Sequence, residues 1–151
     1  MKSTKLFLIL GDQLFPHKYT NKYKKDHIFF MAEDYGLCTY EKHHKQKILF
    51  FLSSMRSYAD EIKKNKYELI YYKFNEKYFE TDYIDKIKKI IILKKISEIT
   101  SFEVENKLFE KKLTIFFKKE KINWNIIQSP MFMNSRSEFK EYVDNSKKIL
   151  N

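Results

Sequence analysis

The chain has 151 residues, the length of one domain with a buried core, and its 43% apolar content excludes a disordered protein. A net charge of +10 suggests nucleic-acid binding, but only Arg56 and Arg136 among the 30 basic residues are arginines, the type that phosphate and groove recognition favours. A lysine surface exposed to water is therefore the preferred interpretation, with DNA contact expected to be weak or indirect.

The first part of the chain is predicted to form two buried strands and a long helix. A continuous apolar run predicts a strand over Lys5–Leu10, and His27–Met31 has the same character. From about Thr39 to Lys64 apolar residues recur every three or four positions, which predicts an amphipathic helix with Thr39 as a partial N-cap. The residues predicted to face the core are Ile48, Phe51, Leu52, Met55, Tyr58, Ala59 and Ile62.

The second part continues the alternation of strands and helices. The predicted elements are a strand over Tyr67–Phe74, a helix capped by Thr81 or Asp82 that runs to about Leu93, a strand over Ile96–Thr100, a helix over Glu103–Lys119, a strand over Ile122–Ile127 and a helix over Ser135–Lys148. The helix over Glu103–Lys119 contains the apolar residues Val104, Leu108, Leu113 and Phe116, and in the last helix Phe139, Tyr142 and Val143 are predicted to face inward. This order specifies an α/β fold, a three-layer Rossmann-like domain with a mostly parallel five-stranded sheet over residues 1–151.

Polar residues follow the first two strands, at the edge where open α/β sheets bind ligands. Gly11, Asp12 and Gln13 come directly after the first strand: the two side chains can hydrogen-bond a polar ligand, and glycine lets a ligand approach the backbone. An ordinary strand-ending turn is the alternative. Glu33 and Asp34 end the second strand, where an acidic residue either meets ligand hydroxyls or caps the next turn. No phosphate-binding glycine motif is present, so an ATPase or GTPase is not expected.

A second polar cluster lies at the start of the long predicted helix. Tyr40, His43, His44 and Lys47 are spaced i, i+3, i+4 and i+7, which predicts one shared helix face. A tyrosine beside two imidazoles and a lysine suits an aromatic, hydrogen-bonding ligand such as a pterin or flavin-like ring; a solvated helix start is the alternative. A metal site is not expected, because adjacent histidines point roughly 100° apart and no third ligand is suitably spaced.

The lone cysteine and the N-terminus bear on the compartment. Cys38 cannot form an internal disulfide, which suits a reducing compartment, and without a His/Asp partner frame it is interpreted as an ordinary thiol. The N-terminal apolar run is too short to cross a bilayer and lacks a signal-peptide cleavage site. We therefore expect a soluble cytoplasmic protein with no membrane partner.

Several segments together resemble the cryptochrome/photolyase superfamily. They are Leu8-Ile-Leu-Gly-Asp-Gln-Leu14, Met31-Ala-Glu-Asp34, Tyr40-x-x-His-His-Lys-x-Lys-Ile48 continuing to Ser54-Met-Arg56, and Phe132-Met-Asn-Ser-Arg-Ser-Glu-Phe139. The branch they resemble most is the deoxyribodipyrimidine photolyase-related proteins, which include bacterial iron–sulfur cryptochromes and (6-4) photolyases. The last segment is similar to the one that precedes the interdomain linker of that family.

The resemblance implies an N-terminal antenna-type domain of a light-dependent DNA-repair or blue-light-sensing protein. Its ligand would be 6,7-dimethyl-8-ribityllumazine or a flavin-like antenna. FAD and a 4Fe-4S cluster are expected only in a C-terminal domain that this chain lacks, because one cysteine cannot ligate a four-iron cluster. The chain is thus expected to be a truncated or split photolyase-type lyase without its catalytic residues, with a separate FAD-domain chain as candidate partner.

Two departures from the family pattern keep other hypotheses open. The sequence Ser-Phe-Glu-Val-Glu-Asn over 101–106 stands where the family has a Glu-Pro-Gly-Glu-Trp-Arg-like stretch. Leu37 aligns with the acidic residue that contacts the antenna in lumazine-binding relatives. These departures favour a second hypothesis, a non-catalytic remnant or protein-interaction module with the same fold. A third hypothesis, based on charge alone, is a basic nucleic-acid-binding domain.

Overall fold

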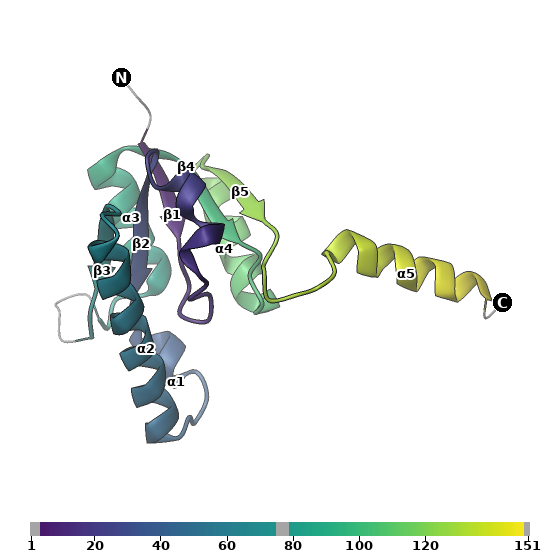
Figure 1. Cartoon of the computed structure of the whole chain (residues 1–151), viewed down its shortest axis with the longest axis horizontal. Coiled ribbons are helices and arrows are strands. Elements are labelled where there is room, and N and C mark those ends of the chain that lie inside the picture. Colours follow the sequence, from purple (N-terminus) through teal and green to yellow (C-terminus); the bar gives the residue numbers. More distant parts are fainter. Residues whose placement is uncertain (1–3, 75–78, 150–151) are drawn as a thin grey trace.

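The sheet has five strands, all of them parallel (Figure 1). The computed structural model describes residues 4–74 and 79–149. The strands are β1 (Thr4–Leu8), β2 (His27–Ala32), β3 (Leu69–Tyr72), β4 (Ile96–Phe102) and β5 (Asn123–Ile127), and their order in the sheet is β3-β2-β1-β4-β5. The predicted α/β class is confirmed. From β1 the chain first builds outward to β3 and then to β5, so the winding direction reverses between β1 and β4.

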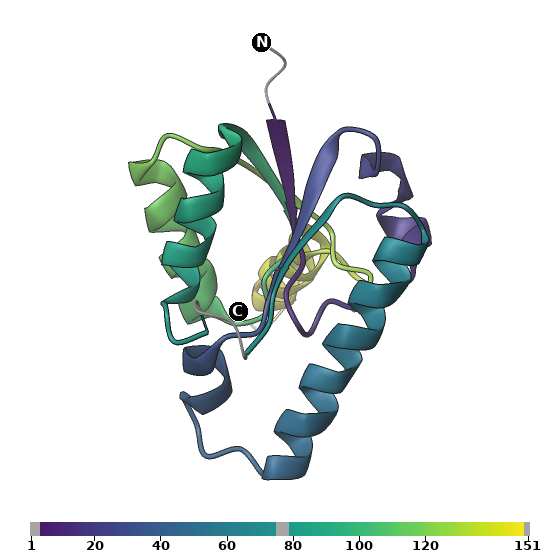
Figure 2. The same cartoon turned by 90° about the vertical axis from the view of Figure 1, so that its left-hand side faces the viewer.

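Helices cover both faces of this sheet, which gives three layers (Figure 2). The helices in the described part of the chain are α1 (Tyr35–Thr39), α2 (Lys45–Lys64), α3 (Tyr83–Lys94), α4 (Lys107–Lys119) and α5 (Arg136–Ile149), with two 3-10 turns, η1 (His17–Tyr19) and η2 (Asn21–Tyr23). The two 3-10 turns and α2 lie on one face, and α3 and α4 on the other. No helix in the described part of the chain is long and apolar enough to span a membrane.

Each face of the sheet has its own hydrophobic core, and β1 contributes to both. Leu6 and Leu8 pack with residues of α3 and α4, whereas Phe7 and Ile9 pack with residues of α2. Side chains alternate between the faces of a strand, so a central strand covered on both sides needs apolar residues at every position. This explains the continuous apolar run from which the first strand was predicted.

The long helix predicted from Thr39 is two helices with a break between them. Asp34 caps α1, since its carboxylate accepts a hydrogen bond from the Leu37 amide at 2.9 Å. Thr39 is the last residue of α1, and its hydroxyl bonds back to the Tyr35 carbonyl. The α2 helix begins only at Lys45, with His44 as its N-cap. The predicted N-cap at Thr39 was therefore wrong, because residues 39–47 are polar and carry no apolar spacing that fixes where a helix starts.

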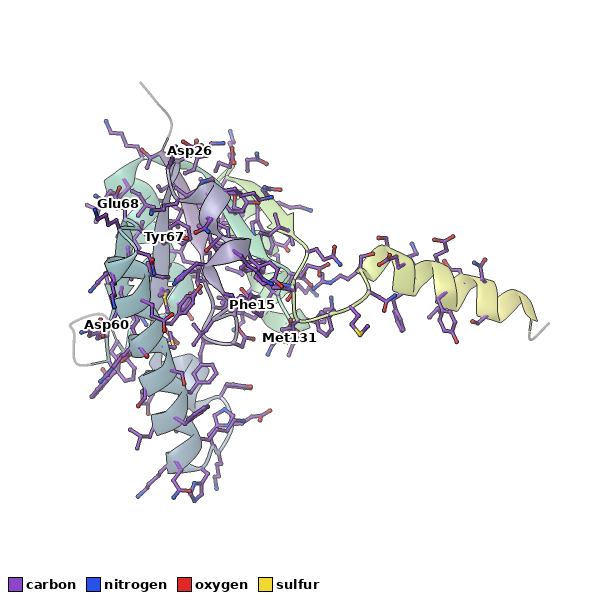
Figure 3. The ribbon with its side chains drawn as sticks, in the orientation of Figure 1. Phe15, Asp26, Asp60, Tyr67, Glu68 and Met131 are labelled. Carbon is purple, nitrogen blue, oxygen red and sulfur yellow. The ribbon has the colours of Figure 1, made fainter. Side chains whose placement is uncertain are left out.

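Two other expectations also need correction. The α4 helix begins at Lys107 rather than Glu103, because the Glu103 amide, just past the end of β4, still bonds to the carbonyl of Ile127, the last residue of β5. Leu108 is 77% exposed on the outer side of the first turn of that helix. In α5, Phe139 and Tyr142 are 65% and 70% exposed. Figure 3 shows that α5 stands clear of the sheet and its covering helices, so its apolar side has no core to face.

The strand predicted over Tyr67–Phe74 is shorter in the structure. It covers only Leu69–Tyr72, because the Tyr67 amide still bonds to the Ile62 carbonyl at the end of α2. At the other end the Phe74 amide donates to a buried carboxylate instead of to a neighbouring strand. Asp82, one of the two predicted caps, is confirmed as the N-cap of α3.

Each of the three helices that cover the sheet ends at a lysine with left-handed backbone conformation. Lys66, Lys95 and Lys121 have φ values of 59°, 52° and 55° and lie at or just after the ends of α2, α3 and α4. This conformation closes a helix well but brings the Cβ atom of an ordinary residue close to its own carbonyl, so glycine usually occupies it. The chain has only two glycines, and both lie elsewhere.

Candidate functional site

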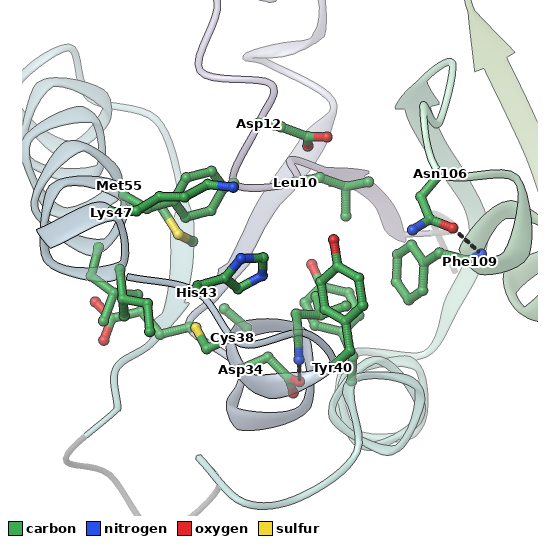
Figure 4. Close-up of a pocket in the computed structure, with 18 of the residues that line it drawn as sticks. Leu10, Asp12, Asp34, Cys38, Tyr40, His43, Lys47, Met55, Asn106 and Phe109 are labelled. Carbon is green, nitrogen blue, oxygen red and sulfur yellow. Dashed lines mark hydrogen bonds between the residues drawn. The ribbon is translucent and has the colours of Figure 1, made fainter. Parts of the chain in front are cut away.

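A cavity of about 290 Å³ opens at the carboxyl ends of β1 and β2 (Figure 4). Its walls come from the β1 turn, the end of β2, α1, the first half of α2, the start of α3 and the β4–α4 connection. It therefore lies beside the position where the winding of the sheet reverses, the usual ligand site of open α/β sheets.

The cavity has an apolar interior and a polar mouth. Leu10, Met55 and Val104 are buried in its walls. Tyr40 is 62% exposed at the mouth, and its ring meets the His43 ring edge to face at 5.3 Å between centroids. Figure 4 shows both rings at the open side of the cavity. An apolar interior with few polar groups is typical of sites for small aromatic ligands.

The structure brings six of the eight candidate residues to this cavity. They are Gly11, Asp12, Glu33, Tyr40, His43 and Lys47. The predicted common helix face is wrong, because Tyr40 and His43 lie in the break between α1 and α2 and only Lys47 is helical. Their role as ligand contacts stays a prediction.

The other two candidate residues have structural contacts outside the cavity. Gln13 is fully buried, and its side-chain nitrogen donates to the Glu103 carbonyl at 2.8 Å, which ties the β1 turn to the end of β4. His44 is exposed, and its ring nitrogen accepts a hydrogen bond from the Gln46 amide at the start of α2. Neither residue lines the cavity.

Gly11 is needed for packing against α2. A Cβ atom at this position would lie 2.5 Å from Cε1 of Phe51 and 2.9 Å from the sulfur of Met55. Contacts this short do not occur, so with a larger residue the side-chain ends of Phe51 and Met55, or the turn itself, would have to shift. Gly11 thus lies against side chains of α2 and also lines the cavity, and its role in admitting a ligand stays a prediction.

The Glu33 carboxylate is fully buried and fully bonded. It accepts two hydrogen bonds from Arg56, at 2.7 and 2.9 Å, one from the Tyr71 hydroxyl at 2.6 Å and one from the Phe74 amide at 2.7 Å. Burial acts to raise the pKa of this carboxyl, but the four bonds outweigh it and the pKa is lowered. Glu33 is thus an ionised structural group with no oxygen left for a ligand.

Asp34 forms a buried ion pair with Lys86. The ammonium group of Lys86 donates to Asp34 and also to the carbonyls of Glu33 and Phe79, at 3.3 and 3.1 Å. The lysine is fully buried, so its charge depends on these partners. Sequence reasoning missed it. A signal was present, because Lys86 stands at a core-facing position of α3 between the buried residues Tyr83 and Ile87.

The opposite wall of the cavity carries polar groups that are only partly satisfied. Tyr83 is 3% exposed, and its hydroxyl has no hydrogen-bond partner among the described residues. Nearby on the β4–α4 connection, outside the cavity lining, one carboxylate oxygen of Glu105 is also buried without a partner among the described residues, and burial together with Asp12 raises the pKa of that carboxyl. Water reaches Asp12 at the cavity mouth, yet the surrounding protein atoms raise its pKa as well.

Asn106 adds a hydrogen-bond donor to this wall. Its side-chain oxygen accepts from the Phe109 amide at 3.0 Å and so caps α4. Because the oxygen is engaged, the amide nitrogen is the end of the side chain that faces the cavity (Figure 4). Neither Asn106 nor Tyr83 was among the residues predicted from sequence.

The site does not fit a metal or an iron–sulfur cluster. Among residues 4–74 and 79–149 no three His, Cys, Asp or Glu side chains are grouped to hold a metal ion. Iron–sulfur clusters need several cysteine thiolates, and the chain has only Cys38. Burial and the nearby Asp34 raise the pKa of this thiol, so it stays protonated.

A parallel sheet with this strand order and a cavity beside its switch point defines a Rossmann-like domain. The family model described as "Deoxyribodipyrimidine photo-lyase-related protein" matches residues 7–151. The chain therefore belongs to the deoxyribodipyrimidine photolyase-related family, as its motifs had indicated.

A curated relative is similar over almost the whole chain. It is described as a "(6-4) photolyase" of Agrobacterium fabrum and is 26% identical over 148 residues. The alignment covers 97% of this chain and 29% of the relative. The chain thus spans less than a third of the length of that protein.

Proposed function

We propose that this chain is an antenna-type domain that binds one planar aromatic chromophore, a lumazine or a flavin-like ring, for light-dependent DNA repair or blue-light sensing. The observation that carries the proposal is the cavity at the switch point, with apolar walls and hydrogen-bond donors on one side. Membership of the deoxyribodipyrimidine photolyase-related family agrees with this proposal. The photolyase activity is named for the longer relative, and its extension to this chain is itself part of what we propose.

The size of the cavity favours a fused-ring ligand. Its volume of about 290 Å³ is at the low end of the range for small-molecule sites, about 300–1,000 Å³. A two- or three-ring head fits this space better than a whole dinucleotide such as FAD. In this proposal the FAD and the iron–sulfur cluster belong to a further domain or a separate chain.

The bound ring would supply the light absorption, and the protein would hold it. Leu10, Met55 and Val104 exclude water from one face of the ring and fix its depth in the cavity. The Tyr40 ring at the mouth is placed to cover the outer edge by stacking. Lys47 sets a positive charge at the same opening, which suits a ligand with phosphate or ribityl oxygens.

Direct binding tests this proposal. Purified chain is titrated with 6,7-dimethyl-8-ribityllumazine, riboflavin or FMN, and the fluorescence of each chromophore is followed. We expect saturable binding of one molecule per chain for at least one of them. The cavity-blocking variant Leu37→Trp serves as the control, because Leu37 is 40% exposed at the cavity and the larger ring can be placed without disturbing the core. Absence of binding to all three chromophores contradicts the proposal.

The second candidate is a ligand-free interaction module with the same fold, and Leu37 favours it. This apolar residue lines the cavity where lumazine-binding relatives are expected to have an acidic contact. The variant Leu37→Glu separates the two candidates. If the wild-type chain binds no chromophore and Leu37→Glu binds lumazine, the wild-type site has lost its ligand and the second candidate is supported.

A further inference from the structure

Lysines gather at the edge of the sheet opposite the cavity. The parallel strands begin at this edge and the helices α2, α3 and α4 end there; Figure 2 shows it at the top of the view, with α1 at the bottom. Four stretches of chain form the edge, residues 21–26, 61–68, 91–95 and 116–122. Together they contain eleven lysines and four acidic residues, so these short stretches hold most of the net charge of +10.

The connections at the cavity edge have the opposite charge balance. They comprise residues 9–16, 33–44, 73–74, 79–82 and 103–106, and they contain eight acidic residues and two lysines. The positive charge is therefore concentrated at one end of the molecule, whereas a lysine surface that serves only solubility has no reason to be one-sided. A one-sided distribution creates a positive potential that attracts and orients an anionic partner.

The lysines of this edge are not neutralised within the described part of the chain. None of the eleven forms an ion pair with a described residue. All of them except Lys24 are exposed to solvent. Of the acidic residues at the edge, Glu120 is already paired with Lys88, which lies outside the eleven. An anion from outside the molecule can therefore reach most of these ammonium groups.

The backbone at three of these lysines indicates that their charge has a use beyond stability. Lys66, Lys95 and Lys121 have φ values of 59°, 52° and 55°, a conformation in which glycine or asparagine is usual. A cation at a helix C-terminus offsets only part of the strain. Other lysines in the last turns of α2, α3 and α4 already fill that electrostatic role. The fold thus carries a strain that its own stability does not require, and such strain points to function.

We propose that this edge is a binding surface for the phosphate backbone of double-stranded nucleic acid, with the cavity facing away from it. Lysine contacts phosphate as a point charge, whereas the reading of bases favours the planar fork of arginine, so the contact does not depend on base sequence. The lysines lie at the end of α2 on one face of the sheet and at the ends of α3 and α4 on the other, so they cover the whole edge. The inference goes beyond the proposed chromophore site and does not depend on it.

An anionic membrane has the same charge, but this edge offers few apolar side chains that could enter lipid. Among the described residues of the four stretches, the exposed large apolar side chains are Ile92 and Leu93, 66% and 74% exposed. Both belong to α3, so the ends of α2 and α4 present charge without an apolar anchor. Binding of a basic surface to lipid depends on buried apolar area as well as charge, whereas non-specific binding to nucleic acid depends on charge. Nucleic acid is therefore the partner that fits this edge.

The test measures binding of a short fluorescein-labelled DNA duplex by fluorescence anisotropy, between about 50 and about 200 mM salt. For the wild type we expect binding that weakens steeply as the salt concentration rises. The variant Lys66→Gly/Lys95→Gly/Lys121→Gly should bind at least about tenfold more weakly, and the slope of log affinity against log salt should fall by up to about 3, since each lost phosphate contact removes about 0.9. Glycine accepts the left-handed conformation, so this variant keeps its thermal stability and a loss of binding is not a loss of fold.

A charge-matched control removes three lysines from other parts of the surface. In Lys42→Gln/Lys45→Gln/Lys111→Gln the changed residues are exposed and lie at the cavity edge or in the first half of α4. The control has the same net charge as the glycine variant. At physiological salt its affinity for the duplex should stay within about twofold of the wild type, because charges far from the contact are screened.

Three results overturn the inference. If the wild-type chain shows no salt-dependent binding to the duplex, the edge is not a nucleic-acid surface. If the glycine variant and the charge-matched control lose affinity equally, net charge alone is responsible and the edge has no special role. If the wild type binds vesicles of phosphatidylcholine and phosphatidylserine but not the duplex, the partner is a membrane surface. All these measurements are made without a chromophore, so their outcome is separate from that of the proposed function.

Discussion

The two polar walls of the cavity differ in how completely their groups are bonded. On the β2 side, Glu33 accepts four hydrogen bonds and Asp34 pairs with Lys86. On the side formed by α3 and the β4–α4 connection, the Tyr83 hydroxyl is buried without a partner among the described residues. Both walls are polar and lie a few residues from the ends of neighbouring strands. Only the second has a buried polar group left unpaired in the described part of the chain.

This difference predicts which substitutions change the stability of the fold and which change the binding of a ligand. A buried charge with all its partners inside the protein holds the fold together, and its removal leaves those partners unpaired. A buried donor that lacks a partner costs stability in the free protein and regains it when a ligand supplies the acceptor. We therefore expect substitutions on the β2 side to change the free energy of unfolding, and substitutions on the other side to change ligand affinity.

The largest effect is expected for Lys86→Met. It leaves the Asp34 carboxylate buried without its counter-charge, which should lower the free energy of unfolding by about 3–5 kcal/mol. Denaturant unfolding measures this loss. The control is Lys88→Met on the same helix, whose ion pair with Glu120 is partly exposed and should contribute about 0–1 kcal/mol.

If Lys86→Met does not fold, a double variant that removes both charges of the pair still tests the prediction. In Lys86→Met/Asp34→Asn the unpaired charge is gone and the cap of α1 is retained, so much of the lost stability should return. Equal stability of the single and double variants would contradict the prediction, because it would mean that the unpaired Asp34 carboxylate is not the cause of the lost stability.

The next largest effect is expected in how the free energy of unfolding of Glu33→Gln and Asp12→Asn depends on pH. The pKa of Glu33 is lowered from its ordinary value of 4.5, so its contribution is complete above that pH and is lost as the pH falls through the lowered pKa. At neutral pH, Glu33→Gln should therefore cost about 1.5–3 kcal/mol, and the cost should shrink toward pH 3.

Asp12→Asn should have the opposite sign. The pKa of Asp12 is raised from 3.8, so ionisation of this carboxyl destabilises the folded chain as the pH rises through the raised pKa. Because Asp12 is exposed and solvent screens its charge, the gain at neutral pH should not exceed about 0.5 kcal/mol, and it should vanish below pH 3.8. Thermal unfolding between pH 3 and 7 measures both variants. If both variants lose stability at neutral pH, the opposite effects expected from the two pKa shifts are wrong, and the two carboxyl groups do not differ in their electrostatic contribution.

Gly11→Ala tests whether the β1 turn belongs to packing or to binding. The added Cβ would overlap Phe51 and Met55, which should cost about 1–3 kcal/mol of stability. Gly36→Ala is the control, because the nearest atom to its Cβ is an Asp34 oxygen at 3.2 Å, and its cost should stay below about 1 kcal/mol. A Gly11→Ala chain of wild-type stability that no longer binds a chromophore would restore the interpretation first drawn from the sequence.

The smallest effect on stability is expected for Asn106→Ser. Serine caps a helix about as well as asparagine, so unfolding should change by only a few tenths of a kcal/mol. The amide donor is lost, and chromophore affinity should fall several-fold in the same titration. Asn106→Ala is the comparison, since it removes the cap as well and should cost about 1 kcal/mol. Unchanged affinity in both variants would remove Asn106 from the recognition wall.

Much of the architecture could be predicted because the signals are local and repeated. The apolar run through Leu6 and Phe7 reports a strand buried on both faces, and the alternation with amphipathic helices fixes a parallel sheet. The break between α1 and α2 could not be predicted, because His44 is an uncommon cap and no apolar residue precedes Ile48 in that helix. The exposure of Phe139 could not either, because amphipathic spacing does not say whether a partner surface is present.

The location of the candidate site could be predicted from the sequence, but the bonding state of the residues around it could not. The rule that ligands meet the carboxyl ends of strands located the cavity through Asp12 and Glu33. The rule does not distinguish a carboxylate already bonded to Arg56 from one that is free, since that depends on residues distant in sequence. Tyr83 looked like one more core residue of α3, because a hydroxyl without a partner can be recognised only from its three-dimensional surroundings.

The left-handed lysines at the helix ends have a consequence for engineering. Each of Lys66, Lys95 and Lys121 holds a conformation that costs an ordinary residue about 1–2 kcal/mol, offset in part by the favourable position of a cation at a helix C-terminus, about 0.3–1 kcal/mol. These three joints between helix and strand lie away from the cavity. Replacing these lysines with glycine should remove this conformational cost and raise the free energy of unfolding. They are therefore the first positions to change for a thermostable version of the domain.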